Sequence, residues 1–151
     1  MAKMHARRRG KAGSKRPLVT ENPEWVPLSQ EEIIQMVVKY GKEGMPTAKI
    51  GMNLRDQYAV PDVKLATGKT ILDILKENDL APKLPEDLVA LMRRAIDLNV
   101  HVVENAKDHA NHRGLQLIEA KIRRLVRYYK REGVLPTDWE YSLKNAELLI
   151  E

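Results

Sequence analysis

The sequence predicts an all-α protein with three parts: a basic extended N-terminal arm, a small three-helix module, and a helical bundle built on a long antiparallel pair of helices. Three observations predict this class. Apolar residues recur at three- and four-residue spacing, capping patterns precede those segments, and no segment alternates strictly between apolar and polar residues as a half-buried strand does. The 151 residues suffice for a modest core, which must be aliphatic because phenylalanine is absent.

Residues 1–27 form the predicted arm. They lack a periodic apolar pattern, and their first sixteen residues contain seven positive charges and no acid. Because such a segment buries too little apolar surface to offset the ordering entropy, we expect it to be disordered away from its partner. A solubility or targeting tail is the alternative to a polyanion contact. The candidate phosphate-binding residues are Arg7, Arg8, Arg9, Lys11, Lys15 and Arg16.

Residues 28–80 are expected to form the three-helix module. Residues 29–32 (Ser-Gln-Glu-Glu) have the pattern of a capping box, and Gly41 or Gly44 is expected to end that first helix. The second helix is expected to have Thr47 as its N-cap and to be broken by Pro61. The predicted inward positions of these two helices are Ile33, Ile34, Val37, Val38, Ile50, Leu54 and Tyr58.

The third helix is expected after a connection over residues 62–67, and it should end near Asn78 with Ile71, Leu72 and Leu75 facing inward. Three short helices in series also suggest a helix-turn-helix unit, with residues 47–58 as the DNA-reading helix. The outward face of that helix is not strongly basic, since it carries Lys49, Asn53, Arg55 and Asp56. A DNA-binding regulator is therefore kept as an alternative hypothesis.

Residues 81–151 are expected to form the C-terminal module, after a proline-rich linker at residues 81–85. A helix begins at Glu86, and the turn at residues 105–109 should return the chain as an antiparallel helix over residues 110–131, which Gly133 and Pro136 close. A last helix is predicted over residues 139–150. The expected inward positions are Leu88, Leu91, Met92, Ala95, Leu98, Val102, Leu143, Ala146 and Leu148 or Leu149.

The predicted helix at residues 110–131 has two different faces. One face is apolar, with Leu115, Ile118, Ile122, Leu125 and Tyr129. The other is cationic and carries Arg113, Lys121, Arg123, Arg124, Arg127, Tyr128, Lys130 and Arg131. Such a helix can pack inward and bind phosphate outward, with Tyr128 available to stack on a base or to bond a sugar.

The polar turn before this helix favours contact with RNA. A-form RNA displays 2′-hydroxyls and base edges in a shallow minor groove, which a short side chain on a turn, such as that of Asp108, can reach. The alternative is that Asp108 only caps the helix, and a lone histidine such as His101 is by default a partly buried structural residue. His109 and His112 are spaced like a metal pair, but no third strong ligand is near in sequence, so neither a metal nor a cofactor is expected.

Several classes of protein are excluded or disfavoured. The absence of cysteine excludes disulfides, thiolate zinc sites and cysteine catalysis. There is no apolar run near the roughly 18 residues of a membrane span and no signal-peptide core, so we expect a soluble intracellular protein. A glycine-rich phosphate loop, paired carboxylates and an activated nucleophile are all missing, so we expect no enzyme; a nuclease built on Asp108, His109 and His112 is the alternative.

Motifs in consistent order along nearly the whole chain identify a family resemblance. They are Met4-His5-Ala6-Arg7, Gln57-Tyr58-Ala59-Val60-Pro61, Pro85-Glu86-Asp87-Leu88, Lys107-Asp108-His109, Arg113-Gly114-Leu115 and residues 124–130. The chain resembles the universal small-subunit ribosomal protein family number fifteen, in its archaeal and eukaryotic branch. The resemblance implies a non-enzymatic, cytoplasmic ribosomal constituent that binds central-domain small-subunit rRNA early in assembly, at a three-helix junction. It also implies neighbouring ribosomal proteins as partners and a contact with the large subunit.

The resemblance further implies two sets of RNA contacts. His101, Asp108 and position 111 correspond to residues that read a minor groove in the bacterial branch; this chain has Asn111 where serine is usual there. Arg124 and Tyr128 correspond to a pair that faces the junction. Together with the arm, the predicted RNA-binding residues are His101, Asp108, Asn111, Arg113, Lys121, Arg124, Arg127, Tyr128 and Arg131.

Overall fold

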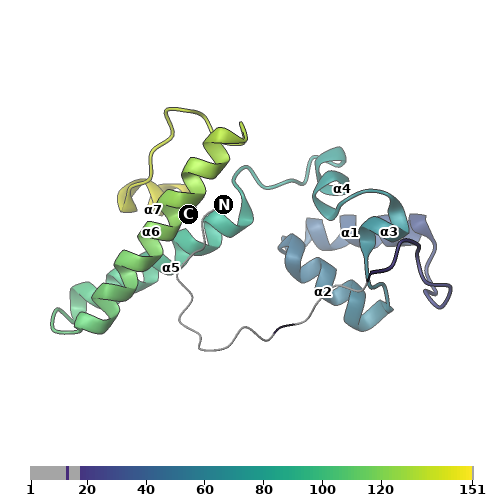
Figure 1. Ribbon diagram of the computed structural model, residues 1–151, viewed down its shortest axis with the longest axis horizontal. Helices are drawn as coiled ribbons and strands as arrows, with labels where there is room; N and C mark the ends of the chain where they lie inside the picture. Colours follow the sequence, from purple (N-terminus) through teal and green to yellow (C-terminus); the bar gives the residue numbers. More distant parts are fainter. Residues whose placement is uncertain (1–12, 14–17, 151) are drawn as a thin grey trace. The chain divides into compact units, whose positions relative to one another are not determined.

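The computed structural model describes residue 13 and residues 18–150. Its regular elements within these residues are all helices, which confirms the predicted all-α class (Figure 1). The chain divides into two compact units, one within residues 12–83 and the other, as far as it is described, within residues 84–150. Each unit has its own apolar core. The assignment of the second unit as the RNA-binding module stays a prediction.

The N-terminal unit contains four helices: α1 (Gln30–Lys42), α2 (Thr47–Tyr58), α3 (Val63–Thr67) and α4 (Ile71–Glu77). The predicted capping box is present, because the Ser29 backbone N–H donates to the Glu32 carboxylate at 2.8 Å and the Ser29 hydroxyl accepts from the Glu32 N–H at 3.4 Å. The buried core comprises Ile33, Val37, Ile50, Leu54, Val60, Val63, Ile74 and Leu75.

The starts of two helices in this unit differ from the prediction. Pro46, not Thr47, is the N-cap of α2, and its carbonyl accepts from the Ile50 N–H at 3.0 Å. Residues 62–67 are not a plain connection, because the Asp62 carboxylate accepts from the Lys64 N–H at 2.9 Å and starts α3. Gly68 ends α3 at a φ of 74°. Five helical residues are too few to show a helical period in the sequence.

The inward face of α4 also differs from the prediction. Ile71 and Leu75 do pack on the core, but Leu72 is 40% exposed and Ile74 is fully buried. An unpredicted capping box between Thr70 and Asp73 fixes the start of this helix. In a seven-residue helix the apolar pattern is compatible with more than one rotation about the axis, and the packing against α1 selects this one.

The C-terminal unit is built on α5 (Glu86–Glu104) and α6 (His109–Arg131), which run antiparallel and lie side by side, with α7 (Leu143–Ile150) packed on α5 (Figure 1). Leu115, Ile122 and Leu125 are buried as predicted, and Val126 joins them. Tyr129 is half-buried. The core comprises Leu88, Met92, Ala95, Leu115, Ile122, Leu125, Val126, Leu135 and Ala146.

The last helix is shorter than predicted. Residues 139–142 are irregular, and Trp139 and Tyr141 pack on the core from this segment. Ala146 is buried as expected, but Leu148 and Leu149 are exposed, and Ile150 takes the inward position instead. Because these aromatic side chains already cover the core from residues 139–142, the helix needs to bury only a narrow face.

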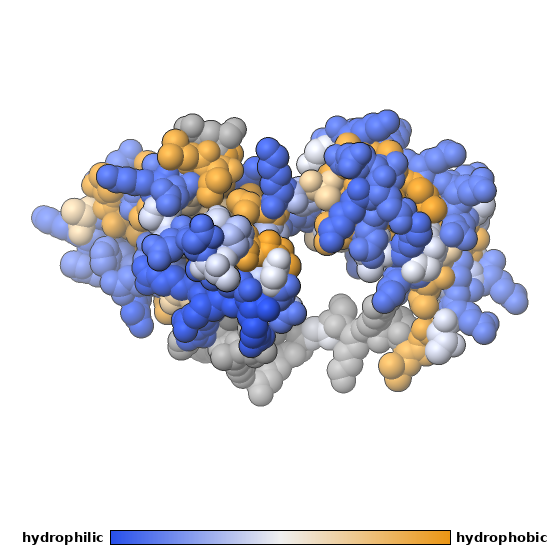
Figure 2. Space-filling view, turned by 90° about the horizontal axis from the view of Figure 1, so that it is seen from above, coloured by the Kyte–Doolittle hydropathy of each residue, from blue (hydrophilic) through white to orange (hydrophobic). Residues whose placement is uncertain are grey.

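Figure 2 shows hydrophilic side chains over most of the visible surface, with apolar residues in smaller groups between them. Among the described residues, no helix is long and apolar enough to cross a membrane.

Candidate nucleic-acid interface

The turn between α5 and α6 brings three predicted site residues together. The chain reverses over residues 105–108, where the Asn105 N–H donates to the His101 carbonyl at 2.9 Å and the Asp108 N–H donates to the Asn105 carbonyl at 2.9 Å. This tight reversal sets the last turn of α5 beside the first turn of α6. His101, Asp108 and Asn111 therefore form one cluster, although the first and the last are ten positions apart in the sequence.

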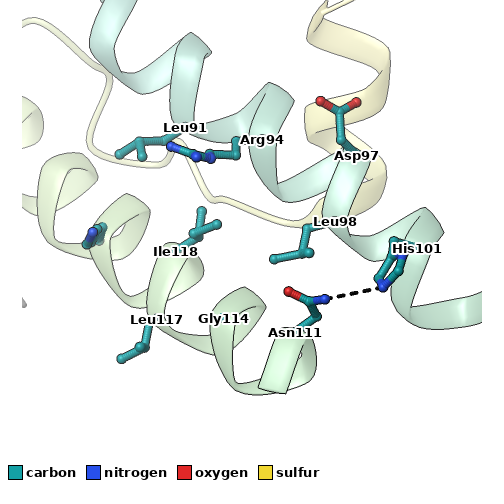
Figure 3. Close-up of a pocket in the computed structure, with 10 residues that line it drawn as sticks. Leu91, Arg94, Asp97, Leu98, His101, Asn111, Gly114, Leu117 and Ile118 are labelled. Carbon is teal, nitrogen blue, oxygen red and sulfur yellow. Dashed lines mark hydrogen bonds between the residues drawn. The ribbon is translucent and has the colours of Figure 1, made fainter. Parts of the chain in front are cut away.

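The cluster converges on one oxygen of Asp108. The Asn111 side-chain Nδ2 donates to Asp108 Oδ2 at 2.7 Å, and His101 Nε2 lies 3.2 Å from the same oxygen. Asn111 Nδ2 and His101 Nε2 lie 3.3 Å apart (Figure 3). The other oxygen, Oδ1, accepts from the Asn111 backbone N–H at 3.0 Å, so Asp108 is the N-cap of α6 as predicted and bonds the two side chains as well.

These bonds stabilise the charged form of Asp108. The hydrogen bond from the Asn111 backbone, followed by those from the His101 and Asn111 side chains, lowers the pKa of Asp108 from 3.8 to about 2. Asp108 is therefore a carboxylate at neutral pH, and a carboxylate only accepts hydrogen bonds. It would repel phosphate, and its chemistry suits a base amino group or a ribose 2′-hydroxyl.

A cleft of about 620 Å³ continues from this cluster between α5 and α6 (Figure 3). Its apolar lining includes Leu98, Gly114 and Ile118, and two cations, Arg94 and Lys121, line it farther along. Lys121 was predicted as a site residue, whereas Arg94 was missed. The spacing of Arg94 could have revealed it. Arg94 lies seven residues before His101, which is about two helical turns, so the two side chains share one face of α5.

The cationic face of α6 carries the remaining predicted residues that the structure describes. Helical spacing places Arg113, Arg124 and Arg131 within about 20° of one another around the helix axis. The Arg131 guanidinium carbon lies 5.7 Å from the centroid of the Tyr128 ring, and that ring packs edge-on against Tyr129 at 5.2 Å.

Two arginines of this face have partners within α6. The Arg113 Nη1 donates to the Gln116 side chain at 3.0 Å, and the Arg127 Nε donates to the Arg123 carbonyl at 3.4 Å. The structure does not bring the C-terminal part of this face to the polar cluster, because Asn111 and Tyr128 are roughly 25 Å apart along the helix. The described part of α6 therefore presents two separate candidate contacts.

The six candidate residues of the arm, Arg7, Arg8, Arg9, Lys11, Lys15 and Arg16, lie outside the described residues. Within the residues that are described, no group of three or more His, Cys, Asp and Glu side chains is placed to hold a metal ion.

Comparison with known proteins gives two family matches and several full-length relatives. Residues 1–60 match the family described as Ribosomal S13/S15 N-terminal domain, and residues 71–149 match the family described as Ribosomal protein S15. The chain is 52% identical over 150 residues to the small ribosomal subunit protein uS15 of Methanocella arvoryzae and of Methanococcoides burtonii, and 51% identical to that of Methanoculleus marisnigri. Each alignment covers 99% of both chains.

Proposed function

The chain belongs to the ribosomal protein S15 family, in its archaeal type, and from that premise we propose that it holds small-subunit rRNA through the polar turn and the cationic face of α6. The family matches and the full-length relatives confirm the predicted resemblance. The family is a structural, non-enzymatic one, so the protein is a constituent of the small ribosomal subunit, among rRNA and other ribosomal proteins.

The observation that carries the proposal is the cluster of His101, Asp108 and Asn111 around one ionised carboxylate. Hydrogen-bonded side chains on a tight turn present a rigid polar edge that fits the shallow minor groove of A-form RNA. Asp108 accepts from an RNA donor there, and Arg94 and Lys121 in the adjoining cleft neutralise phosphates that flank the groove.

The second contact uses Arg124 and Tyr128, with Arg131 in the same row. Arginine forms forked bonds with phosphate, and tyrosine stacks on an unpaired base or bonds a sugar. A rigid helix with two contacts roughly 25 Å apart engages two RNA helices at once and fixes the angle between them. This suits a three-helix junction in the central domain, bound early in assembly, and the resemblance adds a contact with the large subunit.

Affinity measurements test this proposal. The purified chain is titrated with a central-domain junction RNA and with a random duplex DNA of equal length, over several salt concentrations. We expect the junction to bind about a thousandfold more tightly, in the range of specific over non-specific binding. His101→Ala combined with Asp108→Asn should abolish that preference, while asparagine at position 108 still caps the helix.

Equal affinity for the two nucleic acids, with a steep dependence on salt, would instead describe a nonspecific cationic binder and would contradict the proposal. The circular dichroism melting curve of the double variant is the control for folding.

A further inference from the structure

Asn105 contacts His101 twice, although the sequence did not mark it as a site residue. Its side-chain Nδ2 donates to the His101 carbonyl oxygen at 3.0 Å and lies 3.4 Å from His101 Nδ1. A carbonyl oxygen only accepts, so the Asn105 amide must turn its nitrogen, not its oxygen, toward His101. The second hydrogen on that nitrogen is then available to His101 Nδ1.

This orientation decides which ring nitrogen of His101 carries the proton. Nδ1 faces a donor and therefore acts as an acceptor, which leaves the proton on Nε2, 3.2 Å from the Asp108 carboxylate. In this tautomer both contacts are hydrogen bonds, and one of them is to a charged group. The His101 Nε2–H and the Asn111 Nδ2–H then both donate to Asp108 Oδ2. The 3.3 Å between these two nitrogens is therefore the distance between two donors that share one acceptor.

The other tautomer satisfies fewer groups. With the proton on Nδ1, His101 gains a bond from the Asn111 amide to Nε2, but the Nε2 lone pair faces the Asp108 carboxylate and the Nδ1 proton faces the Asn105 amide nitrogen. The doubly protonated ring keeps the bond to Asp108, yet it also sets Nδ1–H against the Asn105 donor. The neutral Nε2–H form is the one in which both ring nitrogens are matched.

We propose that Asn105 is a positioning residue that holds His101 as the neutral Nε2–H tautomer and thereby fixes the hydrogen-bonding pattern that the turn offers to RNA. The RNA part rests on the proposed function. With His101 and Asn111 both donating to Asp108, the Asn111 Oδ1 is left as an acceptor, and it has no hydrogen bond from the described residues. The turn then presents an acceptor to an amino group or 2′-hydroxyl.

Charged groups of both signs surround His101. Asp108 faces it from the turn, Asp97 and Arg94 line the same cleft from α5, and Lys121 lines it from α6. Two of these groups are cations and two are carboxylates, so their formal charges balance. We therefore assign the tautomer to the contacts of Asn105 and Asp108 with the individual ring nitrogens.

The first experiment measures the imidazole 15N shifts of the free, full-length chain by long-range 1H–15N NMR at pH 7. Wild type should show a protonated Nε2 and an unprotonated Nδ1 for His101. Asn105→Ala should give a mixture of tautomers, and Asn105→Asp should protonate both nitrogens, because its carboxylate accepts where Nδ1 would have to donate. Asn99→Ala on the same helix is the matched control and should leave the shifts as in wild type.

A protonated Nδ1 in wild type, or unchanged His101 shifts in Asn105→Ala, would overturn the inference whatever the RNA result. The second experiment measures the affinity of Asn105→Ala for the junction RNA between pH 5.5 and 8. We expect a loss of about fivefold at pH 7, the equivalent of one hydrogen bond, and a steeper dependence on pH than in wild type.

Changed shifts with unchanged affinity would overturn the RNA part of the inference. A different result would contradict the proposed function: junction binding by the His101→Ala and Asp108→Asn double variant that equals that of wild type.

Discussion

The Tyr129 hydroxyl lies 2.7 Å from each carboxylate oxygen of Asp87 and so ties the C-terminal half of α6 to the first turn of α5. The two residues are 42 positions apart. Burial, followed by the bond to Asp87, raises the pKa of Tyr129. Since Tyr128 is the next residue, this link also holds the proposed junction-facing ring in place through its edge-on contact with Tyr129.

Tyr129→Phe should lower the free energy of unfolding by about 1 kcal/mol, because it removes a hydrogen bond and leaves the ring packing intact. Urea unfolding at pH 7 measures the change. The raised pKa means that the hydroxyl stabilises the fold fully below its ordinary value of 10.0 and loses that effect as the pH rises above it. Because the tyrosinate is buried beside Asp87 and the variant has no group to ionise there, the advantage of wild type should shrink and then reverse at strongly alkaline pH. A constant difference would refute the assignment.

The Asp108 carboxylate should stabilise the fold in a pH-dependent way. Its pKa falls from 3.8 to about 2 on folding, so its contribution is present above the unfolded pKa of 3.8 and is lost as the pH falls through about 2. The unfolding free energy of wild type should exceed that of Asp108→Asn at pH 5, and the difference should shrink steadily as the pH is lowered toward 2. Asp138→Asn serves as the control, and the same convergence there would assign the effect to general charge.

Gly114→Ala separates a packing role for this glycine from an RNA role. A Cβ at this position would lie 3.5 Å from the Leu98 Cδ2, which is an ordinary contact, so packing does not require glycine. We expect the unfolding free energy to rise by up to about 1 kcal/mol through helix propensity. Junction affinity should fall by about tenfold, the equivalent of 1.4 kcal/mol, since the methyl group enters the cleft of the proposed RNA contact.

Gly51→Ala in α2 is the matched control, because its Cβ would lie 3.4 Å from the Ile71 Cδ1 and should leave RNA binding unchanged. If Gly114→Ala binds the junction RNA as tightly as wild type does, the part of the cleft that Gly114 lines does not belong to the RNA interface.

Arg124→Ala combined with Tyr128→Ala should weaken junction binding by about tenfold or more without unfolding the protein. One stacked base contributes about 1–3 kcal/mol, and loss of a phosphate contact should reduce the salt slope by about 1. Affinity against salt concentration measures both effects. Arg123→Ala, on the same helix and paired with Glu119 at 3.3 Å, should change the affinity less. Wild-type affinity of the double variant with an unchanged melting curve would remove the pair from the interface.

Tyr141→Phe should raise the free energy of unfolding by about 1 kcal/mol. The Tyr141 hydroxyl is buried and has no hydrogen-bond partner among the described residues, and burial raises its pKa to about 12. An unsatisfied buried hydroxyl destabilises the fold, and phenylalanine removes it while keeping the ring. Tyr129→Phe is the direct comparison, because it should change the free energy of unfolding in the opposite direction. A lower free energy for Tyr141→Phe would reveal a partner for the hydroxyl in solution.

The sequence alone determined the helical class, the family and the helix start at Ser29, and it gave capping by Asp108 as one of two interpretations of that residue. Each of these is local information: a capping pattern spans three or four residues, and a long amphipathic helix repeats its apolar spacing over several turns. The longest helices were accordingly the best predicted. Their inward faces needed small revisions: Val126 joins the face of α6, and in α5 Val89 and Ile96 pack on the core but Val102 does not.

The tertiary structure decided what no local pattern encodes. Helices α3, α4 and α7 have only 5, 7 and 8 residues, too few to repeat an apolar spacing clearly. Whether such a helix forms, and which of its faces is buried, is therefore decided by packing against the rest of the unit. The contacts of His101 with Asp108 and Asn111 depend on the tight reversal over residues 105–108. The hydrogen bonds across that turn, and with them the position of the proton on the His101 ring, depend on distances between atoms. The order of residues in the sequence does not fix those distances.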